Sequence, residues 1–273
     1  MKQKTSRIDY SKAMLPRTRK AQLGDVFKMN YSVLLKCGLL LFVFFIPLLA
    51  YSLFMDFYYM SLMQYTTEDI EQTRTLFFYF LYSGITLLTL PVIVAISGIT
   101  HILRNLIWGE GIYFASDFGA GIKQNAPKNL IFGFITGVLF FISYFVSTLF
   151  NVSIISYLPL ILFTIIFLPT YFWMLFLNNT YSSNWTSLVK NSFFFYIRHI
   201  GWSLLGLLMP LCLVGLLFMP LALIWLKYII LTLFIVFIFP IIFLIMTLFT
   251  TSKFDQYINK EYYPDYYMKG LNY

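Results

Sequence analysis

Charged residues are scarce in this 273-residue chain, and their scarcity decides the class of protein. Only 11% of the residues are charged and 60% are hydrophobic, whereas roughly a quarter of the residues in a soluble domain are charged. No Asp, Glu, Lys or Arg occurs between Lys128 and Lys190. One membrane span needs about 20 apolar residues, so this interval can hold two spans and a turn. The composition therefore excludes a water-soluble globule and predicts an integral membrane protein.

Cysteine is also rare, and the motifs of the common enzyme classes are missing. Cys37 and Cys212 lie in apolar runs without a CxxC pair or a neighbouring His, so we predict neither a disulfide framework nor a metal site. There is no HExxH, P-loop, GxSxG or dinucleotide-binding motif. We therefore expect a protein that is not an enzyme, with no catalytic residues, metal or cofactor.

The apolar runs predict an all-α membrane protein: a bundle of about six transmembrane helices, arranged as three hairpins with cytoplasmic interfacial helices. A basic N-terminal segment (1–32) precedes the six-span domain (33–250), and a Tyr-rich tail (251–273) follows it. We place the spans near residues 33–55, 77–100, 129–150, 154–177, 200–219 and 228–250. The first apolar run is long enough to act as an uncleaved anchor.

The distribution of charge predicts the orientation. The N-terminal segment is rich in Lys and Arg, whereas the first loop carries Asp56, Glu68, Asp69 and Glu71. Because Lys and Arg accumulate on the cytoplasmic side, both termini are expected in the cytoplasm. The same enrichment of Lys and Arg in the cytoplasmic segments explains the net charge of +8. No nucleic-acid partner is expected, because no basic soluble domain is present.

Three cytoplasmic segments have a similar pattern, with a Lys close to an Asn before an apolar hairpin. They contain Lys28 and Asn30, Lys123 and Asn125, and Lys190 and Asn191. Two interpretations stay open: three copies of one unit, in which an interfacial helix precedes two spans, or chance placement. The tail could lie at the lipid headgroups through its tyrosines or be mobile.

Ionisable and helix-breaking residues inside the spans give few functional signals. Asp56 and Lys227 are each expected at a membrane interface, and no buried carboxylate is predicted, which argues against secondary transport. The prolines within the spans are expected to be structural. Gly133 and Gly137 form a GxxxG pattern that allows close packing of a neighbouring helix, or forms a dimer face.

One stretch resembles a known family. The residues that carry the resemblance are Pro91 to Gly98, Gly109-Glu110-Gly111, Phe118, and Lys123-Gln124-Asn125 with Lys128. This pattern is similar to the YesL-like family of bacterial integral membrane proteins, and it covers about residues 88–200. The long basic N-terminal segment and the long loop from Asp56 to Thr75 depart from the family pattern. The resemblance implies a multi-pass protein of the bacterial plasma membrane, without a settled activity, often encoded beside carbohydrate ABC importers.

The leading hypothesis is an accessory protein of carbohydrate uptake that docks a partner, such as an ABC-type sugar importer, through segments 105–128 and 179–199. The candidate docking residues are Glu110, Asp117, Phe118, Lys123, Asn125, Lys128, Trp185, Lys190 and Asn191. Two alternatives are a carrier or channel for a small solute, suggested by the prolines and scattered hydroxyl groups in the spans, and a protein that interacts with lipids through its basic inner surface.

Overall fold

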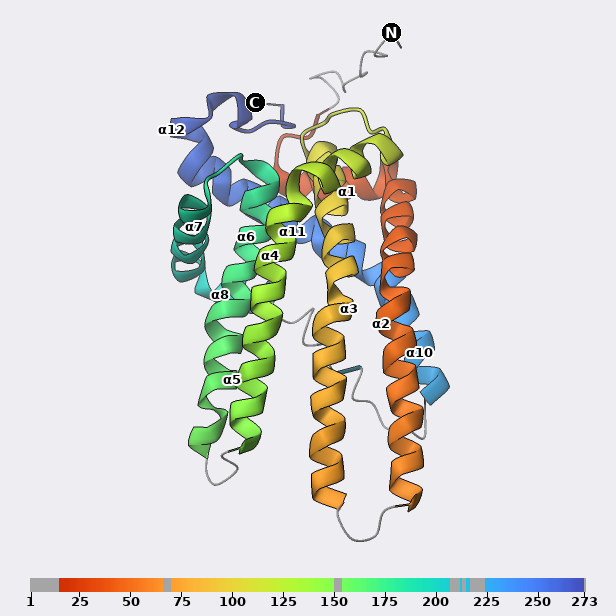
Figure 1. Cartoon of the computed structure of the whole chain (residues 1–273). Helices are drawn as coiled ribbons and strands as arrows, with labels where there is room; N and C mark the ends of the chain where they lie inside the picture. Colours follow the sequence, from red (N-terminus) through yellow and green to blue (C-terminus); the bar gives the residue numbers. More distant parts are fainter. Residues whose placement is uncertain are drawn as a thin grey trace.

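A computed structural model describes residues 15–65, 70–149, 154–206, 212, 215–216 and 224–272. Within these residues every regular element is helical and no strand occurs. In chain order the elements are α1 (Arg19–Met29), α2 (Tyr31–Tyr65), α3 (Ile70–Ile107), α4 (Phe114–Leu149), η2 (Ile154–Tyr157), α5 (Leu158–Leu162), η3 (Phe163–Phe167), α6 (Leu168–Thr180), α7 (Trp185–Arg198), α8 (Ile200–Gly206), α10 (Ile224–Leu233), η5 (Phe234–Ile238), α11 (Phe239–Phe254), η6 (Asp255–Asn259), α12 (Lys260–Tyr262) and η7 (Pro264–Tyr266) (Figure 1).

Five stretches of helix are long and apolar enough to cross a membrane, which confirms the predicted helical, multi-pass class. They are Tyr31–Leu62, Thr75–Ile107, Phe114–Thr148, Ile155–Thr180 and Ile224–Tyr262. Half of the predicted span 200–219 and residues 151–153, between the third and fourth predicted spans, lie outside the described residues. Only α8 and a few isolated residues represent that span.

The first two long helices extend further than the sequence predicted. We expected a loop from Asp56 to Thr75, but α2 continues to Tyr65 and α3 begins at Ile70. A single carboxylate does not end a helix, and the residues from 57 to 65 include neither Gly nor Pro, which are the residues that interrupt helices most strongly. Asp56 is therefore a helical residue.

The predicted interfacial segments also differ from one another. The segment around Lys123 is not a separate helix, because α4 runs without a break from Phe114 into the apolar span. The segment around Lys190 does form a separate helix, α7, which packs against α6 and buries Leu188 and Phe195. The segments around Lys123 and Lys190 therefore have different structures: one begins a long helix and the other is a helix of its own.

Two prolines in the long helices follow a wider helical turn. The π-helical turn η3 ends two residues before Pro169, and η5 ends two residues before Pro240. Proline has no backbone N–H and its ring clashes with the carbonyl one turn earlier, and a π-helical turn accommodates such a disruption without ending the helix. The two turns are consistent with a structural role for these prolines.

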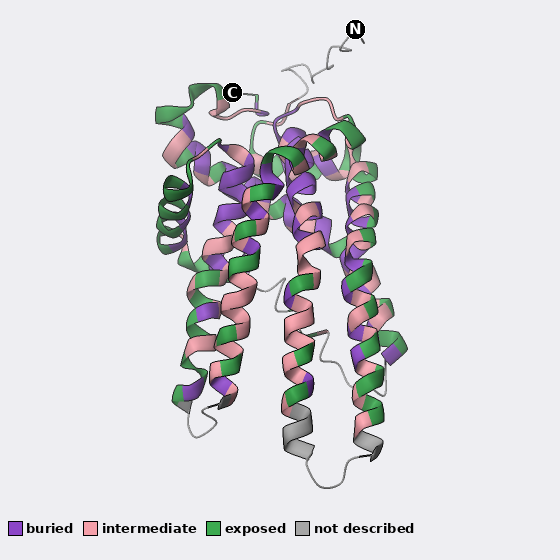
Figure 2. Cartoon of the chain, viewed as in Figure 1, coloured by how far each residue is buried: buried purple, intermediate pink, exposed green. Residues whose placement is uncertain are grey.

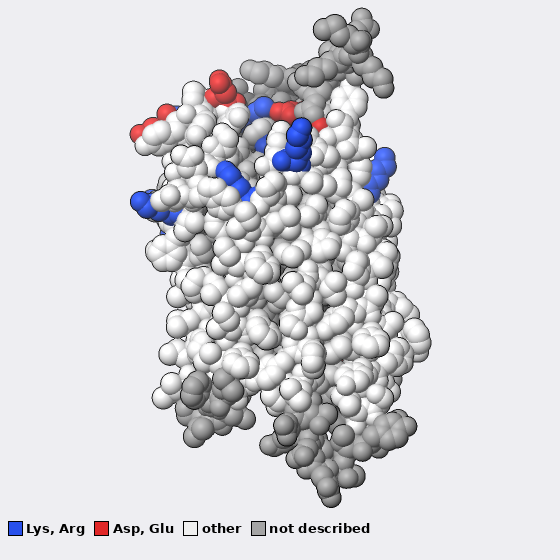
Figure 3. All heavy atoms as spheres, viewed as in Figure 1, with Lys and Arg blue, Asp and Glu red and all other residues white. Residues whose placement is uncertain are grey.

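Charged side chains gather at one end of the bundle, which we call the charged end (Figure 3). It carries α1, the loop at 108–113 and residues 255–272 (Figure 1). Buried residues are concentrated in the half of the bundle next to this end (Figure 2). The antiparallel pair α2–α3 and the pair formed by α4 with α5 extend from it toward the opposite end (Figure 1).

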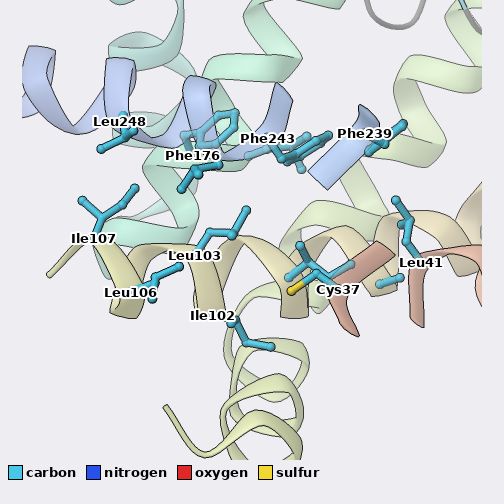
Figure 4. Packing of buried hydrophobic residues seen from close by; sticks show 14 of the residues in the cluster. Cys37, Leu41, Ile102, Leu103, Leu106, Ile107, Phe176, Phe239, Phe243 and Leu248 are labelled. Carbon is cyan, nitrogen blue, oxygen red and sulfur yellow. The ribbon is translucent and has the colours of Figure 1, made fainter. Parts of the chain in front are cut away.

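Large apolar side chains fill the space where α2, α3, α6 and α11 meet (Figure 4). Leu41 of α2 and Leu103 of α3 lie close to Phe176 of α6 and to Phe239 and Phe243 of α11 (Figure 4). The rings of Phe239 and Phe243 stack with centroids 4.9 Å apart, and Phe243 lies 6.1 Å from Phe176. This cluster is a packed core between four helices.

Glycines allow α3 and α4 to approach closely. A Cβ atom at Gly121 would lie 2.6 Å from His101 Cβ and 3.0 Å from the backbone of Gly98. Farther along α4, a Cβ at Gly133 would clash with Ile93, and one at Gly137 would clash with Thr86. Both members of the GxxxG pair thus face α3 of the same chain.

Candidate functional site at the charged end

The two segments predicted to dock a partner meet in space. Lys128 of α4 donates from Nζ to the carbonyl oxygen of Ser183, in the loop between α6 and α7, at 2.5 Å. Its ammonium group also lies 5.9 Å from the ring centre of Trp185, and the ring of Phe132 lies 5.1 Å from that of Trp185. These contacts fix the start of α7 against α4.

Buried asparagines connect α3, α4 and α6 below this contact. Asn178 of α6 donates from Nδ2 to the carbonyl oxygen of Asn125 at 3.0 Å and to Oδ1 of Asn129 at 2.8 Å. Asn129 in turn donates to Ser97 Oγ of α3 at 2.8 Å. All four residues are buried, and satisfied hydrogen bonds in an apolar surrounding hold helices in one arrangement. The backbone of Asn125, a predicted docking residue, therefore takes part in the contact between α4 and α6, while its side-chain Nδ2 is buried without a hydrogen-bond partner among the described residues.

A second set of polar contacts lies nearer the end of α3. Asn179 donates to Thr100 Oγ1 at 2.6 Å, and its carbonyl oxygen accepts a hydrogen bond from Arg104. The Arg104 guanidinium also lies 3.1 Å from His101 Nδ1 and stacks 4.6 Å from the ring centre of Trp108. Since Arg104 contacts both α3 and α6, its charge serves to tie these helices together.

Asp117 and Phe118 lie at the beginning of α4 and face the protein. Asp117 is fully buried, and its carboxylate accepts a hydrogen bond from the Tyr113 backbone N–H at 2.8 Å. A carboxylate in the first turn stabilises the start of a helix. Phe118 covers Gly98 of α3, where a Cβ atom would lie 2.4 Å from its ring.

The nine predicted docking residues thus divide by exposure. Lys123, Trp185, Lys190 and Asn191 are exposed, Glu110, Phe118 and Lys128 are half-buried, and Asp117 and Asn125 are buried. The docking hypothesis stays a prediction, and the four exposed residues are those that can contact a partner directly.

The C-terminal segment is packed onto the charged end. Asp255 of η6 forms an ion pair with Arg19 of α1 at 2.8 Å, and its Oδ1 accepts a hydrogen bond from Asn259 at 2.8 Å. The hydroxyl of Tyr181 lies 2.5 Å from Asn259 Oδ1. Burial, with the nearby Asp255 charge, raises the pKa of Tyr181, so this hydroxyl stays protonated and donates.

Two further contacts hold the same segment. Lys269 forms an ion pair with Glu110 at 2.6 Å and stacks 4.4 Å from the ring centre of Trp108. The backbone N–H of Asn272 donates to the carbonyl oxygen of Pro16 at 3.0 Å. These contacts pack the described part of the tail against the charged end, and both possibilities for the tail stay predictions. No spacing in the sequence indicated the ion pairs Arg19–Asp255 and Glu110–Lys269, because they join residues 236 and 159 positions apart.

A polar cluster nearer the opposite end joins the first and last long helices. Lys227 Nζ of α10 lies 2.6 Å from Asp56 Oδ2 of α2, although Lys227 is only 1% exposed. The Tyr228 hydroxyl lies 2.9 Å from the same carboxylate oxygen and 3.0 Å from Ser52 Oγ. The exposed Lys36 lies in the second turn of α2, next to the charged end. Twenty residues of helix, about 30 Å, separate Lys36 from Asp56. The cluster therefore lies near the far boundary of a hydrocarbon layer about 30 Å thick.

The sequence interpretation placed Asp56 at the end of a span and Lys227 in a turn, and it missed their pairing. A signal was present: one acid and one base, each alone in a long apolar run. Opposite charges at matching depths of antiparallel spans stabilise each other, because burial of either charge alone is costly.

Five apolar helices joined by buried polar contacts define the class of this chain, a multi-pass helical membrane protein. No protein-family model matches it, and neither does a curated protein or a solved structure. The resemblance to the YesL-like family therefore stays a prediction.

Proposed function

We propose that this chain is a non-enzymatic accessory protein that docks another membrane protein through the exposed rim of the charged end. The rim consists of Lys123 on α4 and of Trp185, Lys190 and Asn191 on α7. The observation that carries the proposal is the packed core among the described residues: large apolar side chains occupy the junction of α2, α3, α6 and α11 (Figure 4). That packing leaves surface recognition as the better-supported role.

The rim is suited to docking because its support is rigid. Lys128 fixes the start of α7 to α4, and the buried asparagines fix α4 to α3 and α6. A preformed surface binds with a smaller loss of conformational entropy than a mobile one. The ABC-type sugar importer as the partner, and the bacterial plasma membrane as the location, follow from the family resemblance alone.

The membrane arrangement belongs to the same proposal. The hydrogen bond from Asn272 to Pro16 puts the two ends of the described chain together, so the number of crossings between them is even. Five apolar helices are described, and we propose six spans in three hairpins, with segment 200–219 as the remaining span. The charged end carries Arg17, Arg19, Lys20 and Lys28, which favours the cytoplasmic side.

Site-specific photo-crosslinking in the native membrane tests the docking role. A photoreactive amino acid at position 190 is expected to give one protein adduct, with the same partner in cells grown on several sugars. The matched control is the same amino acid at position 225. Trp225 is 68% exposed and lies at the beginning of α10, away from the charged end. Adducts with lipid alone at position 190, or the same protein adduct from both positions, would contradict the proposal.

A second candidate function is transport of a small solute, and the Asp56–Lys227 pair favours it. Paired charges within spans often mark transport pathways, and this pair joins two helices that are far apart in sequence. The pure protein in liposomes is expected to move a solute if this candidate is correct, and Asp56→Asn is expected to abolish the flux. Absence of flux for a panel of neutral and charged solutes would exclude it.

A further inference from the structure

Two unpaired cations lie together on the outer surface of α7 and α11. Arg198 ends α7 and Lys253 lies in the last turn of α11. Within the described part of the chain, no carboxylate lies within 4.0 Å of either one. Their cationic groups rest instead on aromatic rings: Arg198 lies 4.3 Å from the ring centre of Tyr257, and Lys253 lies 5.8 Å from that of Phe249.

His199 lies between these two rings. Its imidazole centre is 5.6 Å from that of Tyr257 and 6.2 Å from that of Phe249. Its Nε2 atom is buried and has no hydrogen-bond partner among the described residues. Burial lowers the pKa of His199, and the charges of Lys253 and Arg198 lower it further. Arg198 and Lys253 therefore form a region of positive potential with no carboxylate within 4.0 Å among the described residues, and His199 beside them is neutral.

The surroundings of this cluster are apolar and exposed. Trp202 is 57% exposed, and its ring centre lies 5.1 Å from that of Phe249. Phe194, Ile197 and Ile200 are also exposed. Large apolar side chains next to two cations fit a molecule with an anionic head and hydrocarbon chains better than they fit a water-soluble acid.

We propose that Arg198 and Lys253 bind the phosphate headgroup of an anionic phospholipid, whose acyl chains lie along Ile200 and Trp202. Arg198 is stacked on Tyr257, which leaves the N–H groups at the edge of its guanidinium plane for two hydrogen bonds to phosphate oxygens. Lys253 supplies a second positive charge, and the neutral His199 ring lies beside the two cations with its Nε2 atom buried. The lipid belongs to the leaflet at the charged end.

A shallow pocket adjoins the cluster at Tyr257. It has a volume of about 310 Å³ and is lined by Gln256, Tyr257, Lys260 and Glu261. Tyr257 is common to the pocket and to the cation cluster. The pocket leaves room for the glycerol or sugar part of a headgroup, whereas Glu261 disfavours a second phosphate there.

Native mass spectrometry of the full chain in mild detergent tests this site. Phosphatidylglycerol is titrated against phosphatidylcholine, and the wild-type chain is expected to retain one phosphatidylglycerol preferentially. The variant R198Q/K253Q is expected to bind it about 25-fold more weakly, because each cation near an anionic headgroup contributes about fivefold. The variant R198K/K253R keeps both charges and is expected to retain most of the affinity. That result would show that the loss in R198Q/K253Q comes from the missing charges and not from a damaged fold.

The matched control is K123Q/K190Q, which removes the same charge from the rim of the same end. It is expected to change the affinity by about twofold or less, since exposed charges farther away are screened. Equal losses in the two double variants would overturn the proposal, because they would show a general surface potential. Displacement of the lipid by glycerol phosphate or by an acidic peptide at similar concentration would also overturn it, in favour of a soluble anion. This test does not depend on whether a protein partner docks at the rim.

Discussion

Removing one partner of the Asp56–Lys227 pair leaves the other charge buried without a counter-ion. Because Lys227 is 1% exposed, Asp56→Asn is expected to destabilise the fold by about 3 kcal/mol. Tyr228→Phe removes one hydrogen bond to the same carboxylate and is expected to cost about 1 kcal/mol. Thermal unfolding of the purified protein in detergent measures both changes.

The double variant D56L/K227M separates the pairing from a general effect of polarity. It removes both charges, so most of the stability lost in Asp56→Asn is expected to return. If the stability loss of the double variant equals the sum of the losses in the single variants D56L and K227M, Asp56 and Lys227 do not stabilise each other.

His199 gives a pH dependence of known sign. Its pKa in the folded chain lies below the ordinary value of 6.5 because of burial and the neighbouring cations. The unfolded chain therefore binds a proton more readily than the folded one, and stability is expected to fall as the pH drops below about 6.5. His199→Gln is expected to flatten this part of the profile, which thermal unfolding between pH 8 and pH 5 records. An unchanged slope in the variant would assign the acid sensitivity to other groups.

At the residue scale, the sequence predicted the polar type of most site residues but not their partners. Asn125 was recognised beside Lys123, yet its role as an acceptor for Asn178 depends on the approach of α6 to α4. Asp117 was predicted as a docking residue, and its burial follows from the start of α4 at Phe114. Partners distant in sequence require the packing of whole helices, which local pattern does not contain.

Gly119 and Gly121 of α4 form a matched pair at the scale of the element. A Cβ at Gly119 meets nothing within 4 Å, whereas a Cβ at Gly121 meets His101 and the backbone of Gly98. Alanine favours a helix over glycine by about 1 kcal/mol, so Gly119→Ala is expected to stabilise the chain by up to that amount. Gly121→Ala is expected to destabilise it by about 1 to 3 kcal/mol, because α3 and α4 must move apart.

Unfolding in detergent compares the two variants directly. The opposite signs matter more than the magnitudes, since both positions carry the same substitution two residues apart. Equal effects in both variants would mean that α3 and α4 do not approach as closely as described.

The elements themselves were largely predictable because lipid demands long apolar helices with paired backbone groups. Five of the six predicted spans coincide with described apolar helices. Their ends were less predictable: α2 continues nine residues past Asp56, to Tyr65, because nothing between them interrupts a helix. The π-helical turns before Pro169 and Pro240 required knowledge of how the backbone adjusts to proline.

For the whole molecule, cysteine labelling tests the proposed orientation. Cys37 is fully buried and can stay, whereas Cys212 is exposed and is replaced by serine. A cysteine at exposed Lys123, at the charged end, is expected to react with a membrane-impermeant maleimide only after the cells are permeabilised. A cysteine at exposed Ser61, near the far end of α2, is expected to react in intact cells. The reverse labelling pattern would show that the charged end lies outside the cell and would contradict the proposed orientation.

The contacts between the beginning and the end of the chain have a consequence for its synthesis. Helix α1 leaves the ribosome early, yet Arg19 needs Asp255 and Gln22 needs the carbonyl oxygen of Gly270. Asp255 and Gly270 are translated 236 and 248 residues after their partners, so these contacts of α1 form only when that much more of the chain has been made. A chain that stops before Asp255 therefore lacks these contacts of α1, and cellular proteolysis near α1 can distinguish it from a chain that includes them.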